Sequence, residues 1–363
     1  MSDRLTVLMV MAEATGGIGR HVRSLAVGLP DHGIDVMLCA PPASIDRLEL
    51  TGTATRLVPA PVRVVRPGPI RQVRRRLRAA AREAAVVHAH GLRPAVAVAA
   101  AGTGRPMVAT WHNAARGHQL RRRTHAALEH YVARASDLTL TVSDDLSDRA
   151  RRAGARAVDS AFAAAPPLPP PAVGRDEIRR QLGVGERPMV LAVGRLAQQK
   201  RLDLLIAAAA GWAGSADAPI VVIAGSGAWR PRLEGQIRAT GAPVILAGAR
   251  QDIADLLAAA DVAVLTSEWE GRSLSAQEAL QAGVPLVTTA VGGVPGLVGD
   301  AAVLVPFGDV AALRAALERV LGDPELRRDL ATRGRRQAAT WPTLDQVLAR
   351  LAEQYRELAI SRG

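Results

Sequence analysis

Cysteine, lysine and aromatic residues are scarce in this chain of 363 residues. The one cysteine, Cys39, excludes an internal disulfide and indicates a small buried strand residue in a reducing compartment. Two Phe and two Tyr offer few surfaces for stacking on bases, and the arginines are spread along the whole chain. We therefore expect no nucleic-acid partner.

Long apolar runs are also missing, and residues 1–17 lack the charge order and cleavage site of a secretory signal. These absences predict a cytoplasmic protein, with peripheral contact at the inner face of the cell membrane as a further option. Segment 70–82 is the candidate for that contact, because it places apolar residues on one helical face and arginines opposite. An ordinary crossover helix with a solvated arginine face gives the same pattern, and we favour it.

The positive charge comes almost wholly from arginine. The formal net charge is +12, and Lys200 is the only lysine in the sequence. In a chain that uses arginine nearly everywhere, one retained lysine indicates a site that needs a compact ammonium group.

Apolar runs of strand length alternate with helical patterns, which predicts an α/β protein with parallel sheets and crossover helices. The length suits two domains, each with its own core. We expect strands at residues 5–12, 36–40, 85–89, 107–111, 138–142, 189–193, 220–224, 244–248, 261–266, 286–290 and 302–306.

A proline cluster marks the expected domain boundary. Five of the six residues in segment 166–171 are proline, which makes a stiff, extended connector. The prediction is a first domain at 1–165, a linker at 166–173, a second domain at 174–342 and a terminal helix at 343–363.

The most informative segment is 267–298. Glu270 precedes a tight loop, Gly271-Arg272-Ser273, and a helix expected from Leu274 to Ala282 carries Glu278. A loop followed by a helix N-terminus offers backbone N–H groups to phosphate, whereas carboxylates would repel phosphate and suit hydroxyl groups. A ligand with both phosphates and polyhydroxy rings meets both demands, and this describes a nucleotide-sugar.

Two cations follow the strand at 189–193. Arg195 stands just after the strand end and Lys200 five residues later, so the pair could clamp a diphosphate. Two ordinary surface cations would give the same pattern, and the uniqueness of Lys200 favours the clamp.

Glycines and histidines follow strands in the first half. Gly16 and Gly17 lie between the first strand and a helix expected to end near residue 29. They form either a flexible turn or a place where a ligand approaches the backbone closely. His88 and His90 end one strand and His112 another, where parallel sheets form ligand crevices. A structural or acceptor-side role for His88 and His90 is favoured over a metal pair, because no third ligand follows at a suitable spacing.

These motifs together resemble a known family. The E-x7-E pair of Glu270 and Glu278, followed by A-G-V-P and G-G, is similar to the donor-site signature of family 4 glycosyltransferases, and G-R-L-x3-K ending at Lys200 matches a second motif. The resemblance implies the GT-B fold, with two Rossmann-like doubly wound parallel-sheet domains facing a cleft. It also implies a C-terminal helix that crosses back to the first domain, and a retaining mechanism.

The resemblance further implies roles for residues. Arg195, Lys200 and the backbone from Gly271 through Arg272 and Ser273 to Leu274 would hold the donor diphosphate, with Gly16 and Gly17 facing the phosphates from the first domain. Glu278 would bind the ribose, Glu270 would orient the sugar, and His112 would lie beside it. The donor would be a UDP- or GDP-sugar and the acceptor a small or lipid-linked hydroxyl compound. No Asp-x-Asp occurs, so we expect neither a metal nor another cofactor.

One departure from the pattern stands beside Glu270. The family often has E-G-F-G-L, and here Arg272 and Ser273 replace an aromatic residue and a glycine. This departure gives the only support for an inactive scaffold that binds nucleotide-sugar. A nucleotide-sugar 2-epimerase of the same fold is the other alternative, which the pairing of the two motifs disfavours.

Overall fold

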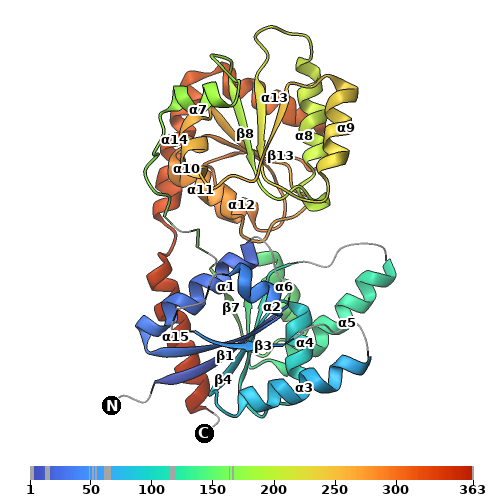
Figure 1. Ribbon diagram of the computed structural model, residues 1–363, viewed down its shortest axis with the longest axis vertical. Coiled ribbons are helices and arrows are strands. Elements are labelled where there is room, and N and C mark those ends of the chain that lie inside the picture. Colours follow the sequence, from blue (N-terminus) through green and yellow to red (C-terminus); the bar gives the residue numbers. More distant parts are fainter. Residues whose placement is uncertain are drawn as a thin grey trace. The chain divides into compact units, whose positions relative to one another are not determined.

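The structure is a computed structural model that describes residues 4–12, 17–48, 50, 53, 55–60, 67–113, 119–162, 164–165 and 167–361. The chain divides into two compact units, one of Met1–Ala164 with Pro342–Gly363 and the other of Ala165–Trp341. Each unit is a parallel β-sheet flanked by helices (Figure 1).

The first unit contains a seven-stranded sheet in the order β3-β2-β1-β4-β5-β6-β7. All of its neighbouring strands pair in parallel. The strands are β1 (Leu5–Met11), β2 (Ile34–Ala40), β3 (Arg56–Pro59), β4 (Val86–His90), β5 (Met107–Trp111), β6 (Leu138–Thr141) and β7 (Val158–Ser160). Cys39 lies fully buried in β2, where burial raises the pKa of its thiol to about 12.

Seven α-helices and one 3-10 helix accompany this sheet among the described residues. They are α1 (Gly17–Gly28), η1 (Leu29–His32), α2 (Pro42–Arg47), α3 (Pro67–Ala81), α4 (Leu92–Ala101), α5 (Gln119–Ala135), α6 (Asp144–Arg152) and α15 (Leu344–Ile360). Helix α15 begins with a capping box between Thr343 and Gln346. It buries Leu348, Leu351 and Tyr355, so the C-terminal helix is part of the first unit.

The second unit repeats the arrangement with six parallel strands in the order β10-β9-β8-β11-β12-β13. The strands are β8 (Met189–Val193), β9 (Ile220–Ala224), β10 (Val244–Gly248), β11 (Val262–Leu265), β12 (Leu286–Thr289) and β13 (Val303–Val305). The helical segments are α7 (Arg175–Gln181), η2 (Gln198–Lys200), α8 (Leu202–Ala209), η3 (Ala210–Trp212), α9 (Arg230–Thr240), α10 (Ile253–Ala259), α11 (Leu274–Ala282), α12 (Val294–Val298), α13 (Val310–Gly322) and α14 (Pro324–Ala339).

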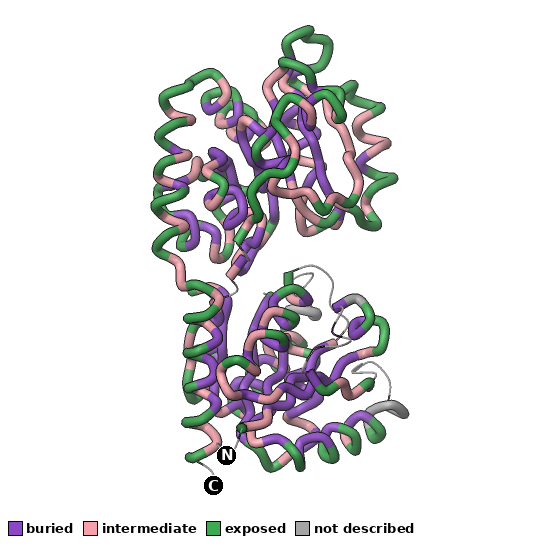
Figure 2. Tube along the Cα trace, turned by 60° about the vertical axis from the view of Figure 1, so that its left-hand side comes forward, coloured by how far each residue is buried: buried purple, intermediate pink, exposed green. Residues whose placement is uncertain are grey.

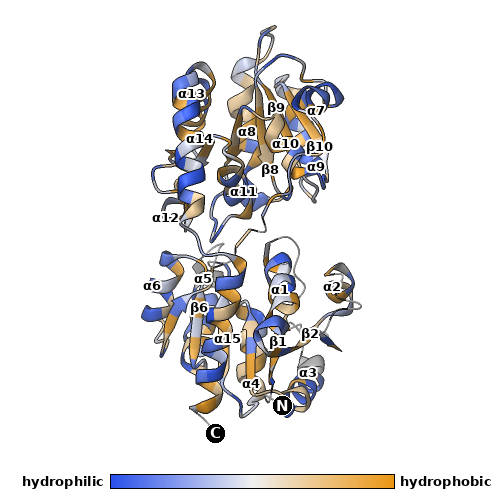
Figure 3. Cartoon of the chain, turned by 90° about the vertical axis from the view of Figure 1, so that its left-hand side faces the viewer, coloured by the Kyte–Doolittle hydropathy of each residue, from blue (hydrophilic) through white to orange (hydrophobic). Residues whose placement is uncertain are grey.

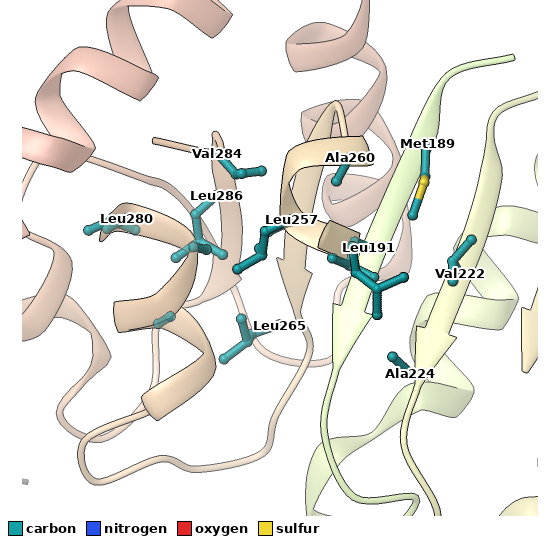
Figure 4. Close-up of a cluster of buried hydrophobic side chains, with 14 of the residues drawn as sticks. Met189, Leu191, Val222, Ala224, Leu257, Ala260, Leu265, Leu280, Val284 and Leu286 are labelled. Atoms are coloured by element: carbon teal, nitrogen blue, oxygen red, sulfur yellow. The ribbon is translucent and has the colours of Figure 1, made fainter. Parts of the chain in front are cut away.

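The four central strands of the second sheet, β9, β8, β11 and β12, are buried on both faces. Successive residues of a strand point to opposite faces, so Met189 and Leu191 join one hydrophobic cluster while Val190 and Ala192 join another. Figure 4 shows the first cluster between the sheet and its helices. The same arrangement appears as buried central strands in Figure 2 and as apolar strands beside mixed helices in Figure 3.

Helix α3 contains most of the arginine-rich segment. Val73 and Leu77 are buried, as the amphipathic pattern predicts, while Arg76 and Arg78 are exposed. These two arginines nevertheless donate hydrogen bonds to the carbonyl oxygens of Pro59 (2.8 Å) and Ala101 (2.6 Å). Across the part of the chain that is described, no helix combines the length and apolar character needed to cross a bilayer.

Both strand orders share one feature that positions a site. The chain runs outward in one direction from β1 or β8, then returns and runs outward in the other direction from β4 or β11. Such a reversal leaves a crevice beyond the carboxyl ends of the two central strands, where open α/β sheets bind ligands. The loops after β8 and β11 are therefore the first place to look for a site in the second unit.

Candidate functional site

The loops after β8 and β11 bring together a lysine and a glutamate. Lys200 Nζ lies 2.7 Å from Glu270 Oε1, and Ser267 Oγ donates to the same oxygen at 2.6 Å. The Glu270 side chain is only 10% exposed and that of Lys200 20% exposed. The sole lysine of the chain is thus held in a largely buried ion pair with one of the predicted site carboxylates.

Backbone contacts hold these two loops together. Thr266 Oγ1 donates to the carbonyl oxygen of Lys200 at 2.8 Å, and Gln199 Nε2 donates to that of Trp269 at 2.8 Å. The N–H of Glu268 donates to the carbonyl oxygen of Gln199 at 2.9 Å. The Lys200–Glu270 pair therefore rests on a frame of three further bonds, which fixes both residues before any ligand binds.

The G-G pair predicted from the sequence packs directly against Glu270. Gly292 has φ of +52°, and a Cβ placed there would lie 2.1 Å from the carbonyl oxygen of Glu270. The N–H of Gly293 donates to that same oxygen at 2.9 Å. Glycine is needed at position 292 both for its left-handed backbone and for the close approach.

Helix α11 begins beside Glu270, at the bounds expected from the sequence. Ser273 is its N-cap residue, with φ of −69° and ψ of 116°, and its hydroxyl accepts from the N–H of Ala276 at 3.4 Å. This backbone conformation does not require glycine, and serine is a preferred cap. The Ser273 departure from the family pattern therefore has a local structural role. Glu278, on the next turn, is 5% exposed.

The other predicted donor residues of the second unit lie near these elements. Arg195 follows β8 and is exposed, whereas Gly271 and Leu274 are buried around the start of α11. The Arg272 guanidinium lies 5.8 Å from the centroid of the Trp341 ring. Neighbouring strands of the second sheet thus carry Arg195, Lys200 and Glu270 at the same edge, with α11 adjoining them.

His112 lies in the first unit, in a group of buried histidines at the ends of β4 and β5. His112 Nε2 is 3.4 Å from His90 Nδ1, and the rings of both contact His21 edge-on. The His88 ring lies against that of His90 with centroids 4.1 Å apart and the two planes tilted by 34°. Of the predicted first-unit residues, Gly17 opens α1 and is exposed, and Gly16 lies outside the described residues.

Both ring nitrogens of His88 are engaged, which gives this residue a structural role. Nδ1 bonds the Tyr355 hydroxyl of α15 at 2.5 Å, and Nε2 bonds Thr110 Oγ1 at 2.6 Å. Neither nitrogen is available to a metal. Within the described ranges, no group of three or more His, Cys, Asp or Glu side chains is placed to hold a metal ion.

Burial keeps this histidine group uncharged. It lowers the pKa of His21 to about 4 and that of His88 to about 3, with a smaller contribution at His88 from the neighbouring His21. Burial, and then the other imidazoles, likewise hold the pKa values of His90 and His112 well below the usual range. At neutral pH these rings act as neutral hydrogen-bonding groups.

Comparison with known proteins places the fold and the motifs in one family. Residues 174–337 match the family model described as glycosyl transferases group 1, and residues 15–160 match the model described as glycosyltransferase family 4. Glycogen synthase of Mycobacterium tuberculosis is 31% identical over 310 residues, which cover 77% of this chain and 69% of that protein.

Two further relatives come from Streptomyces. Alpha-D-kanosaminyltransferase of S. kanamyceticus is 33% identical over 192 residues, covering 51% of this chain and 50% of that protein. The 2-deoxystreptamine N-acetyl-D-glucosaminyltransferase of S. fradiae is 33% identical over 202 residues, which cover 52% of this chain and 46% of that protein. The chain thus spans about half the length of these two curated relatives.

Solved structures show the same fold over nearly the whole chain. HepE of Anabaena, in complex with UDP and glucose, has a TM-score of 0.82 at 21% identity, covering 97% of this chain and 100% of that one. Sucrose-phosphate synthase of Thermosynechococcus elongatus has a TM-score of 0.80 at 21% identity, and the match covers 99% of this chain and 100% of that one. The two doubly wound parallel sheets define a protein of the GT-B class. Within that class, the chain belongs to glycosyltransferase family 4.

Proposed function

We propose that this protein transfers a hexose from a UDP- or GDP-sugar to a hydroxyl acceptor, with retention of anomeric configuration and without a metal ion. The observation that carries the proposal is the Lys200–Glu270 pair at the reversal of strand order in the second sheet. Membership of family 4 and the names of the relatives support it, and the UDP held by HepE favours UDP as the nucleotide.

The donor diphosphate is assigned to Arg195, Lys200 and the N–H groups at the start of α11. As the anomeric C–O bond breaks, negative charge grows on the departing diphosphate, and fixed positive groups lower the energy of that state. Arg195 suits this role as an exposed fork of N–H donors, and Lys200 as a compact charge. Glu270 holds the Lys200 ammonium in position before the donor arrives.

The two carboxylates and His112 are assigned to hydroxyl groups. Glu278 accepts hydrogen bonds from the ribose hydroxyls, because one carboxylate can serve two donors. The second oxygen of Glu270 accepts from the transferred sugar, while Oε1 stays on Lys200 and Ser267. His112, as a neutral imidazole, bonds a hydroxyl of the same sugar.

The reaction exchanges one C–O bond for another. The acceptor oxygen attacks the anomeric carbon on the face that the diphosphate leaves, so the configuration is retained. The bond to the phosphate oxygen breaks with its electron pair, and that oxygen takes the proton of the acceptor hydroxyl. Protein cations compensate the charge, and the products are the glycoside and the protonated nucleoside diphosphate.

Thermal unfolding with UDP-, GDP- and dTDP-sugars, each with and without EDTA, tests donor binding. A nucleotide that binds only the folded protein adds about 2.7 kcal/mol of stability at a hundred times its Kd. We expect one nucleotide series to raise Tm equally with and without EDTA. If no nucleoside diphosphate raises Tm, the proposed activity is wrong; if EDTA abolishes the shift, metal independence is wrong.

Product analysis separates transfer from the two alternatives. Transfer gives a new glycoside whose anomeric proton coupling, measured by NMR, matches that of the donor. An epimerase would release UDP and a glycal without any acceptor, and a scaffold would bind the donor and release nothing.

A cytoplasmic location is proposed separately. Peripheral membrane contact through α3 is the less favoured alternative to a solvated helix face, and flotation with anionic vesicles at low and high salt tests it. The contact should be lost at high salt. A protein that fails to float even at low salt has no such contact.

A further inference from the structure

Arg201, the residue that follows Lys200, has an unfavourable backbone conformation. Its φ of 45° and ψ of 40° lie in the left-handed region, and among the described residues it is the only one other than glycine with a positive φ. This conformation is costly for a residue with a Cβ, and it persists only where the surrounding structure holds it. Strained residues of this kind cluster at ligand sites, and this one directly adjoins the lysine assigned to the donor.

The strained residue joins two elements of the second unit. Arg201 follows the 3-10 turn η2, and its N–H donates to the carbonyl oxygen of Gln198 at 3.2 Å. Its own carbonyl oxygen accepts from the N–H of Leu204 at 2.9 Å, so the same residue begins α8. Helix α8 is fixed in the core by its buried apolar residues. A change of backbone conformation at position 201 must therefore move Lys200 on the other side.

The side chain of Arg201 is held by Asp203, in the first turn of α8. Nε lies 3.0 Å from Oδ1 and Nη2 lies 3.2 Å from Oδ2, which makes a forked contact at two points. The carbonyl oxygen of Asp203 accepts from Gln236 Nε2 at 2.8 Å, which ties this turn to α9. The ring of the exposed Phe307, with its centroid 5.4 Å from the guanidinium carbon, adds a weaker contact. The fork thus offsets the cost of the backbone conformation.

We propose that Arg201 is a positioning residue for the donor. Held by Asp203, it keeps the left-handed backbone that directs the Lys200 ammonium onto Glu270, 2.7 Å away, and it does not touch the donor itself. The proposal rests on the proposed function, because it assumes that Lys200 binds the donor diphosphate. Without the fork, a residue with a Cβ leaves the left-handed region, whereas glycine populates that region readily.

Arg201→Ala and Arg201→Gly separate the backbone from the guanidinium, because both remove the charge and only alanine disfavours the left-handed region. Binding is weakened by the fraction of molecules that keep the competent backbone. We expect Arg201→Ala to raise the Kd of UDP, measured by calorimetry, about fivefold to thirtyfold. Arg201→Gly should raise it only about twofold.

Two results of this comparison would overturn the proposal. An equal rise in both variants would show that the guanidinium contacts the diphosphate itself. A Kd unchanged by Arg201→Ala would show that the conformation at position 201 has no part in donor binding.

A Lys200→Met background tests whether Arg201 acts through the lysine. In that background Arg201→Ala should leave the Kd of UDP unchanged, since no ammonium remains to be positioned. A purely structural role for Arg201 would not make its effect depend on Lys200. The same rise in both backgrounds would therefore overturn the proposal.

Asp203→Asn tests the partner that holds Arg201, because it removes the carboxylate charge and keeps the shape of the side chain. The Kd of UDP should rise about twofold to fivefold, the contribution of a partly exposed ion pair. Combined with Arg201→Ala, it should give no rise beyond that of Arg201→Ala alone, since both changes release the same turn. Additive rises would show that Asp203 does not act through Arg201.

Arg314 on α13 is the matched control, because it too is an arginine paired with a carboxylate, that of Glu318, in the second unit. Arg314→Ala and Arg314→Gly should both leave the Kd of UDP unchanged. Their urea midpoints should also fall in the opposite order. Glycine weakens a helix more than alanine does at position 314, whereas it relieves the backbone at position 201. If Arg201→Ala resists urea better than Arg201→Gly, the conformation at position 201 is not strained and the proposal is wrong.

Failure of this inference is distinguishable from failure of the proposed function. If no nucleoside diphosphate raises Tm, the function itself is wrong. If UDP binds and sugar is transferred while Arg201→Ala keeps the Kd of the original protein, the function stands and Arg201 does not position the donor lysine.

Discussion

The Lys200 ammonium lies 2.7 Å from the Glu270 carboxylate, although 70 positions separate the two residues in the sequence. They meet because β8 and β11 are neighbours in the sheet, and each residue lies on the loop that leaves the carboxyl end of its strand. A parallel sheet whose strand order reverses between these strands brings the two loops to one crevice. The ion pair is thus a direct consequence of the topology of the second unit.

Replacing Lys200 with Met should weaken both folding and nucleotide binding. The change leaves the largely buried Glu270 carboxylate with only the Ser267 hydroxyl on Oε1, and we expect a loss of about 1–3 kcal/mol in the free energy of unfolding. Urea titration measures that loss. Calorimetry should show the Kd of UDP raised at least tenfold, because the proposed charge-assisted contact of Lys200 to phosphate is lost.

A double-mutant cycle with Glu270→Gln isolates the ion pair from other effects of Lys200→Met. The two changes should be non-additive, since each removes the same contact. Arg230→Met is the control, because the Arg230–Glu234 pair is exposed and should contribute no more than about 1 kcal/mol. Additive losses would show that the 2.7 Å contact contributes nothing to stability.

Two changes at Ser273 test its role as a helix cap. Ser273→Ala removes the acceptor of the Ala276 N–H and should lower the free energy of unfolding by about 1 kcal/mol. Ser273→Gly should cost only a few tenths of a kcal/mol, because glycine is tolerated at an N-cap. Urea titration of the two variants decides the matter. An unchanged free energy of unfolding in Ser273→Ala would mean that the hydroxyl does not cap α11.

Stability should fall steeply as the pH drops below 6.5, because the histidine group stays neutral in the folded protein. The unfolded chain takes up protons near pH 6.5, whereas burial lowers the pKa of His21 to about 4 and that of His88 to about 3. Between the pKa of the unfolded chain and those of the folded protein, the unfolded state therefore binds more protons than the folded state. The contribution of these histidines to the free energy of unfolding is fully present above pH 6.5 and is lost toward pH 4. From pH 6.5 to 5.5 the loss is about 1 kcal/mol for each such histidine.

Urea titrations at pH 6.5 and 5.5 measure this dependence, and His21→Gln should reduce the difference between them by about 1 kcal/mol. Thr110→Val is the control, since it removes a hydrogen bond of His88 and keeps every histidine. That variant should lose similar stability at both pH values. A pH difference unaffected by His21→Gln would mean that His21 is not held neutral by the fold.

The sequence predicted the long buried strands well, because an apolar run such as Met189–Val193 has few alternatives in an α/β chain. Edge strands β3 and β7 escaped prediction, since they are three or four residues long and only partly buried. Lys200 could be found from composition alone. The bond between His88 and Tyr355 could not, because 267 positions separate them and neither residue's local pattern indicates the other.

The unpaired indole N–H of Trp111, which finds no hydrogen-bond partner within the described residues, escaped prediction for a related reason. The sequence pattern predicts Trp111 as the apolar end of a strand, and no residue nearby in the sequence indicates that its indole N–H lacks a partner. The unpaired atom becomes visible only once the surrounding backbone and side chains are in place. The same holds for Ser273, which departs from a family motif in sequence and caps a helix in the structure.

Gly292→Ala should distort the Glu270 loop, and a second glycine allows the cause to be isolated. At Gly292, φ is +52° and a Cβ would lie 2.1 Å from the carbonyl oxygen of Glu270. At Gly308, φ is +86° and nothing lies within 4 Å of the added carbon. Alanine at either position incurs the cost of a left-handed backbone, about 1–2 kcal/mol. The clash at position 292 should add about 1–3 kcal/mol to the loss of unfolding free energy.

The clash at Gly292 involves backbone, so no side-chain rotation relieves it, and the carbonyl of Glu270 must move. Gly293 donates its N–H to that carbonyl, so the movement should carry Glu270 away from Lys200 and weaken the binding of UDP. Gly308→Ala should lose stability without any change in the Kd of UDP. If the two variants lose equal stability and bind UDP equally well, the Glu270 loop adapts freely. The close approach of Gly292 would then have no part in holding the ion pair.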